Sequence, residues 1–122
     1  MERNYSLIVN ELVGIQPQDW TRVVAYAQIT EESYEIFFYS KVKDKYVNNF
    51  DLEKKYNLPR VDVRTCFKKV YEELLPDFKE KQWFVCTIQI ERNGKFSFEY
   101  EYTDYSEDSM NFKRIWKNKY LL

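Results

Sequence analysis

Apolar and polar residues alternate over residues 83–103, a period of two that predicts two β-strands joined by a tight turn. A three-residue loop, Arg92–Gly94, pairs Ile90 with Phe96 and gathers the apolar residues on one face. A two-residue Asn-Gly turn would instead pair Ile90 with Ser97 and mix the two faces. We therefore predict the three-residue loop, with Gly94 in the left-handed region, where the absence of a Cβ removes the steric penalty. The apolar face is expected to carry Phe84, Cys86, Ile88, Ile90, Phe96, Phe98, Tyr100 and Tyr102.

The rest of the chain divides into helical and extended patterns. Helical spacing predicts a helix from a cap at Asn4 to about Val13, with a stripe of Tyr5, Leu7, Ile8, Leu12 and Ile15. Residues 20–29 and 34–42 read as strands, residues 45–50 as a short third strand, and residues 51–56 as a helical turn. A long helix is predicted over residues 62–81, with Asp62 as cap and a kink or break at Pro76. A last helix, capped by Ser106 or Asp108, is expected to include Phe112, Ile115, Trp116 and Lys119.

This order is helix, two or three strands, helix, two strands, helix. Short turns within each group of strands indicate antiparallel pairing. We therefore predict an α+β fold in which helices pack against an antiparallel sheet of four to five strands. A chain of 122 residues is expected to form a single domain over residues 1–122.

Composition narrows the range of functions. The 19 basic and 20 acidic residues nearly cancel, so the chain lacks the basic excess of a general nucleic-acid binder. No apolar run is long enough for a membrane span and residues 1–4 do not resemble a signal peptide, so we expect a cytoplasmic protein. The two cysteines, Cys66 and Cys86, are expected to be buried free thiols. The chain has no histidine, the commonest general base and metal ligand.

Carboxylates are the main candidate functional groups. Glu99 and Glu101 project from one side of one predicted strand, on a face expected to be acidic and uncovered. No third metal ligand or nucleophile accompanies them, so we expect no catalytic residues, no metal and no cofactor. Acidic residues can instead steer and bind a basic partner, and ordinary solvation is the alternative. The predicted partner-binding residues are Glu99, Glu101, Asp104, Glu107, Asp108 and, as an anchor that can equally be a core residue, Trp116.

Several segments, in order along the chain, resemble the YezG-type immunity proteins. They are residues 15–20 (IQPQDW), 23–27 (VVAYA), 35–39 (EIFFY), 55–58 (KYNL), 93–96 (NGKF), 100–102 (YEY) and, most clearly, 115–121 (IWKNKYL). Asn118 departs from the family, where an aromatic residue is usual, and so does Gln16, where an apolar residue often precedes Pro17. The resemblance implies a bacterial antitoxin that binds a partner toxin, often a secreted nuclease of Gram-positive bacteria, and it brings no catalytic residues.

The sequence is also compatible with two other function classes. The predicted order of elements is similar to that of small dimeric secretion chaperones that hold an effector for export. An enzyme would need a nucleophile or a metal site, which the sequence does not offer. The sequence leaves undetermined which toxin is bound, which face binds it and how many copies associate.

Overall fold

The structure is a computed structural model that describes residues 5–121. It contains a five-stranded antiparallel sheet with the order β3-β2-β1-β4-β5. The strands are β1 (Trp20–Ile29), β2 (Tyr34–Val42), β3 (Lys45–Asn48), β4 (Val85–Glu91) and β5 (Phe96–Glu101). The helices are α1 (Tyr5–Val13), α2 (Asn49–Lys55), α3 (Arg60–Lys81) and α4 (Ser109–Tyr120), with a short 3-10 helix, η1 (Ser106–Asp108), before α4. The predicted α+β fold and the order of its main elements are confirmed.

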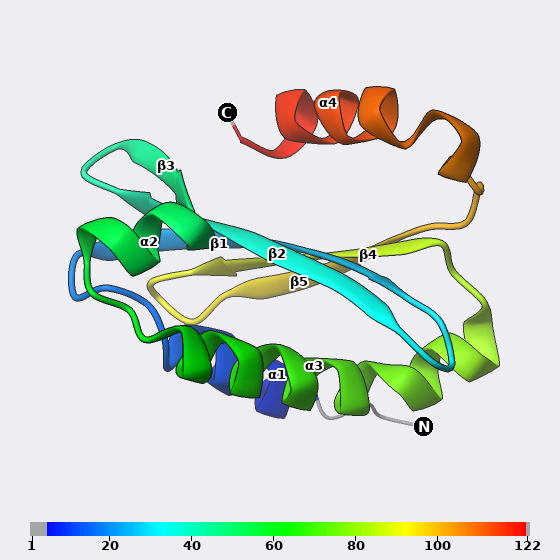
Figure 1. Cartoon of the computed structure of the whole chain (residues 1–122), viewed down its shortest axis with the longest axis horizontal. Coiled ribbons are helices and arrows are strands. Elements are labelled where there is room, and N and C mark those ends of the chain that lie inside the picture. The colour runs from blue at the N-terminus through cyan, green and yellow to red at the C-terminus, as the bar shows by residue number, and fades with distance from the viewer. Residues whose placement is uncertain (1–4, 122) are drawn as a thin grey trace.

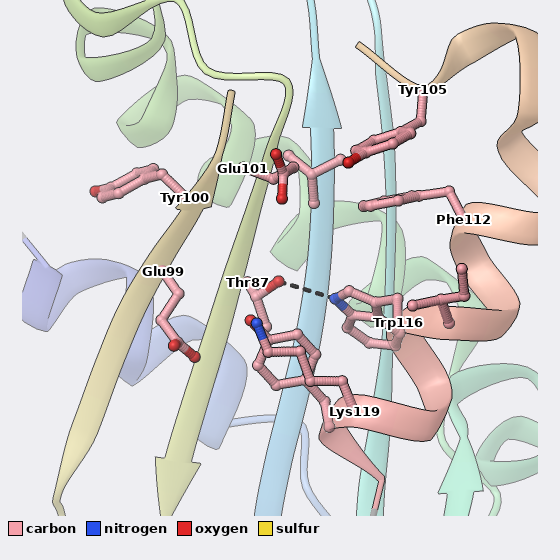
Figure 2. Close-up of a pocket in the computed structure, with 11 residues that line it drawn as sticks. Thr87, Glu99, Tyr100, Glu101, Tyr105, Phe112, Trp116 and Lys119 are labelled. Carbon is pink, nitrogen blue, oxygen red and sulfur yellow. Dashed lines mark hydrogen bonds between the residues drawn. The ribbon is translucent and has the colours of Figure 1, made fainter. Parts of the chain in front are cut away.

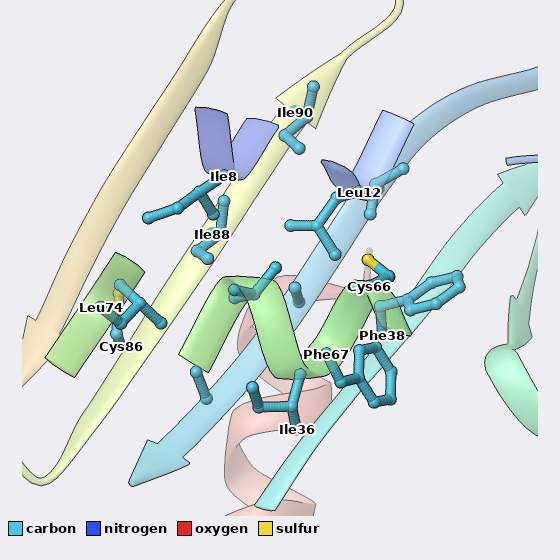
Figure 3. Close-up of a cluster of buried hydrophobic side chains, with 14 of the residues drawn as sticks. Ile8, Leu12, Ile36, Phe38, Cys66, Phe67, Leu74, Cys86, Ile88 and Ile90 are labelled. Carbon is cyan, nitrogen blue, oxygen red and sulfur yellow. The ribbon is translucent and has the colours of Figure 1, made fainter. Parts of the chain in front are cut away.

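Helices lie on both sides of the sheet. Figure 1 shows α1 and α3 along one face and α4 across the other. The larger core lies under α1, α2 and α3, and it includes Ile8, Leu12, Leu52, Val70 and Leu74. Figure 3 shows α1 and α3 side chains meeting Ile88 and Ile90 of β4 and Phe38 of β2. Burial of each large side chain stabilises the fold by roughly 1.5–3 kcal/mol.

The β4–β5 hairpin has the predicted register. Ile90 pairs with Phe96 and Ile88 with Phe98, and the Glu91 N–H donates to the Lys95 carbonyl at 2.8 Å. Gly94 has φ +94°, in the region that favours glycine. The alternating pattern and one glycine therefore determine this hairpin locally.

The start of β4 departs from the prediction. Trp83 packs with the α3 side of the sheet, whereas Phe84 and Val85 both pack on the α4 side, so the expected position of Phe84 beside Cys86 is wrong. Val85 is paired with Glu101, yet the Phe84 N–H also donates to the Glu101 carbonyl at 2.7 Å. Phe84 and Val85 thus both lie opposite Glu101, which is the arrangement of a β-bulge. Because a bulge adds one residue to its strand, the alternation of side chains between the two faces is shifted there.

Local predictions for the helices were partly wrong. Helix α3 begins after Pro59 rather than after a cap at Asp62, and it continues through Pro76 without a break. Leu7 is 48% exposed, and Val9 occupies the buried position instead. Helix α2 begins at Asn49, so the third strand ends at Asn48 rather than at residue 50. The predicted cap Asn4 lies outside the described residues.

Both cysteines are buried and free, as expected. Burial, with a smaller contribution from the charge of Glu11, raises the pKa of the Cys66 thiol to about 12. Burial also raises the pKa of Cys86. Reaction at sulfur requires the thiolate, so neither cysteine is a candidate nucleophile in the folded chain.

Candidate functional site

Helix α4 is held to the sheet by one buried tryptophan. Trp116 is 3% exposed, and its Nε1–H donates to the Thr87 hydroxyl of β4 at 2.8 Å (Figure 2). Its ring meets Tyr26 and Phe37 edge-on, with centroids 5.3 and 5.6 Å apart. Edge-to-face aromatic pairs add to the stabilisation from burial. Trp116 is therefore a core residue in this structure, and its contacts set the distance between α4 and the sheet.

The second core under α4 is aromatic. It consists of Val24, Tyr26, Val85 and Trp116, with partly buried Phe37, Tyr39, Tyr46, Phe84, Phe112, Tyr120 and Leu121 around them. Burial raises the pKa of Tyr26, and the nearby Glu35 carboxylate raises it further. The neutral Tyr26 hydroxyl donates to Gln28 Oε1 at 2.8 Å. This cluster explains why β2 carries apolar residues on both faces: each face is covered by a helical layer.

A hollow of about 240 Å³ opens between α4 and the β4–β5 end of the sheet. Its lining includes Glu99 and Glu101 of β5 and Tyr105, Phe112 and Lys119 from the connector and α4. Figure 2 shows Glu99 and Glu101 on the sheet and the rings of Tyr105 and Phe112 on the opposite wall. The acidic face of the β4–β5 hairpin, which was expected to be uncovered, is therefore partly covered, because the apolar side of α4 lies over it.

The predicted acidic residues line two adjoining depressions. We use the name acidic surface for Glu99, Glu101, Asp104, Glu107 and Asp108. All are exposed except Glu101, which is half-buried. Glu99 and Glu101 line the hollow, while the other three border an adjoining depression, and Tyr105 lines both. Within residues 5–121, none of the five carboxylates takes part in an ion pair.

Hydrogen bonds hold parts of the acidic surface in place. Glu101 Oε1 accepts from the Thr103 N–H at 3.1 Å. Asp104 Oδ1 accepts from the Ser106 N–H at 2.8 Å, and the hydrogen bonds from the Ser106 hydroxyl and N–H hold the pKa of Asp104 below its usual value. These contacts favour the ionised form of Asp104, and no lysine or arginine within residues 5–121 forms an ion pair with it. The arrangement can therefore bind cationic groups supplied from outside.

Glu99 and Glu101, predicted from the sequence as partner-binding residues, share the hollow with residues that the sequence pattern did not indicate. The pattern did not single out Tyr105 or Phe112 as walls of a hollow, nor the exposed apolar side chains Met110 (87%) and Ile115 (52%) on α4. The available signal was the helical spacing of residues 109–120, which places Met110 away from Trp116. Trp116 was predicted as either a partner-binding anchor or a core residue. Its side chain is buried in the fold, so it is not accessible to a partner in this structure.

Residues 5–121 contain no group of three or more cysteine or acidic side chains placed to hold a metal ion. Over the same residues, no helix has the length and apolar character needed to cross a membrane.

Comparisons with known proteins agree with one another. A family model described as "Immunity protein YezG-like" matches residues 1–122. The chain is 26% identical to an Immunity protein YezG of Bacillus spizizenii, with 96% of this chain and 80% of the relative covered. It is 25% identical to an Immunity protein YezG of Bacillus subtilis, over 99% of this chain and 87% of the relative. It is 27% identical to a Type VII secretion system protein EsaG of Staphylococcus aureus, over 86% of this chain and 69% of the relative.

Proposed function

Because this chain belongs to the YezG-like immunity protein family, we propose that it binds a cognate toxin protein and neutralises it, and that the toxin is a nuclease. The observation that carries the nuclease proposal is the acidic surface, whose carboxylates have no ion-pair partner among residues 5–121. A nuclease cleft must hold phosphates and is therefore lined by lysine and arginine. Carboxylates that occupy this cleft would exclude the nucleic acid.

The hollow beside α4 gives this proposal a specific contact. An arginine or lysine of the toxin that enters it would meet Glu99 and Glu101 on one wall and the rings of Tyr105 and Phe112 on the other. Carboxylates give charge-assisted hydrogen bonds, and aromatic faces attract cations. The function needs no catalysis by this chain, and we place it in the cytoplasm of the cell that makes the toxin.

Charge reversal tests the surface. Glu99→Lys/Glu101→Lys is compared with Glu72→Lys/Glu73→Lys, which makes the same charge change at two exposed residues of α3. The partner is the product of the neighbouring gene, and association is followed by surface plasmon resonance at several salt concentrations. We expect the first variant to associate about 10- to 100-fold more slowly and with a flatter salt dependence, because steering is electrostatic.

Two results would contradict the proposal. If both variants associate at the same rate, this surface does not contact the toxin. If the neighbouring gene product binds but has no nuclease activity that the wild-type chain inhibits, the nuclease assignment is wrong while the immunity role stands.

A secretion chaperone is the second candidate, and one observation favours it. The Staphylococcus aureus relative is named a type VII secretion system protein. Deleting the gene should then reduce export of the toxin. If deletion exposes cells to the toxin without any change in export, neutralisation is the function.

A further inference from the structure

Strand β5 leaves one edge of the sheet open. It is the last strand in the order β3-β2-β1-β4-β5, and no described strand pairs with its outer side. The opposite edge strand, β3, spans only Lys45–Asn48 and leads directly into α2. A long open edge is a template for another strand, whereas a short one is a usual means of protection. The open edge of β5 is therefore the place where the sheet can be extended.

The register shows which backbone groups face outward. The Glu91 N–H donates to the Lys95 carbonyl, so Lys95 and the alternate residues after it direct their hydrogen bonds to β4. The residues between them direct their N–H and C=O groups to the open edge. These are Phe96, Phe98 and Tyr100, and no described group bonds their backbone on that side.

We propose that a second copy of this chain pairs with this edge, with its β5 antiparallel to the first and the two-fold axis at Phe98. Phe98 then faces Phe98 of the second copy, and Phe96 faces Tyr100 of the second copy. Each outward N–H and C=O of these residues gains a partner. On the other face Lys95 lies opposite Glu101 of the second copy, an attractive pair that the symmetry repeats.

Charge and exposure favour this register over its neighbours. With the axis at Glu99, the two copies would bring identical carboxylates into direct opposition. With the axis at Ser97, the outward groups of Tyr100 would face Gly94, whose N–H is already bonded to Glu91 at 2.9 Å. With the axis at Phe98, the Phe96 ring, which is 45% exposed, is covered by a tyrosine.

The pairing keeps the layers of the two copies aligned. Residues that face each other in an antiparallel pair share a side of the sheet, so the aromatic rows of both copies stay on the α1 side. Phe98 already stacks on Tyr5 of α1, with ring centroids 4.1 Å apart, and Tyr100 donates to or accepts from the Tyr5 hydroxyl at 2.8 Å. These contacts hold the row in place before the second copy arrives, which reduces the entropy lost on association.

A charge exchange tests the proposal without the toxin. The wild-type chain, Lys95→Glu, Glu101→Lys and the double variant Lys95→Glu/Glu101→Lys are compared by sedimentation velocity at about 1–200 µM, a range that detects weak dimers. Lys68→Glu, an exposed lysine of α3, is the control for the change in net charge. Far-UV circular dichroism confirms that each variant is folded.

We expect the wild type and Lys68→Glu to form dimers as concentration rises. Each single variant should associate about tenfold more weakly, because symmetry turns two attractive pairs into two repulsive ones, and the double variant should recover. A wild type that stays monomeric at every concentration overturns the proposal, and so does a double variant as weak as the singles. Protection of the Phe98 amide from hydrogen exchange only in the toxin complex would overturn it in favour of a toxin strand at this edge.

Discussion

Thr87→Val removes the acceptor that holds Trp116 and keeps nearly the same side-chain shape. Thr87 and Trp116 are each 3% exposed, and their hydrogen bond measures 2.8 Å. The substitution leaves the buried indole N–H without a partner, which costs about 1–3 kcal/mol. For a chain of this length, each kcal/mol corresponds to a melting temperature about 3–5 °C lower. Urea unfolding followed by far-UV circular dichroism measures the loss.

Thr21→Val is the matched control, because Thr21 is also a strand threonine with a hydroxyl hydrogen bond, to the Lys41 carbonyl at 3.2 Å, but an exposed one. It should change the free energy of unfolding by less than about 0.5 kcal/mol. Trp116→Phe combined with Thr87→Val removes both polar groups, so the double variant should lose about 1 kcal/mol less than the sum of the single losses. Equal losses for Thr87→Val and Thr21→Val would refute the assigned role of the Thr87 hydroxyl.

Three further predictions concern other parts of the fold. Gly94→Ala should lower the free energy of unfolding by about 1 kcal/mol in urea titrations, because alanine is strained at a φ of +94°. The loss should come from the backbone alone, since no atom lies within 4 Å of the new Cβ. Asp77→Ala should cost about 2–4 kcal/mol by the same assay, since Asp77 Oδ2 accepts the buried Trp83 Nε1–H at 3.0 Å. Folding raises the pKa of Cys66 from 9.0 to about 12, so stability should fall as pH rises from about 9 toward 12. Between pH 8 and pH 10 the urea midpoint of unfolding should decrease less in Cys66→Ala/Cys86→Ala than in the wild type. An equal decrease in both proteins would exclude the thiols as its cause.

The hairpin was predictable because its determinants are local. A strict alternation of apolar residues and a glycine at the turn leave one register that keeps the faces separate. The bulge before β4 was not predictable in this way. Phe84 and Val85 are both apolar, and only the packing of Phe84 against Phe112 of α4, with centroids 5.8 Å apart, shows that both face the same helix.

Long-range packing also explains why α3 continues through its proline. Pro76 cannot donate a backbone hydrogen bond and disturbs the preceding turn, which costs about 3 kcal/mol in an isolated helix. Leu74 before it is fully buried, and Phe78 after it packs on Trp83 with ring centroids 5.3 Å apart. These contacts hold both sides of Pro76 against the sheet. Local propensity gave the wrong answer because tertiary contacts offset its cost.

The candidate site depends on the same kind of distant contact. The sequence shows the carboxylates of β5, but their surroundings are set by a helix whose anchor, Trp116, bonds to a strand residue 29 positions earlier. Thr87 pairs directly with Glu99 in the β4–β5 ladder, so the bond that fixes α4 also fixes its distance from that carboxylate. The Trp116–Thr87 contact therefore contributes both to the width of the hollow and to the stability of the second core. Substitutions along α4 that leave Trp116 and Thr87 in place should therefore change the lining of the hollow without moving α4 away from the sheet.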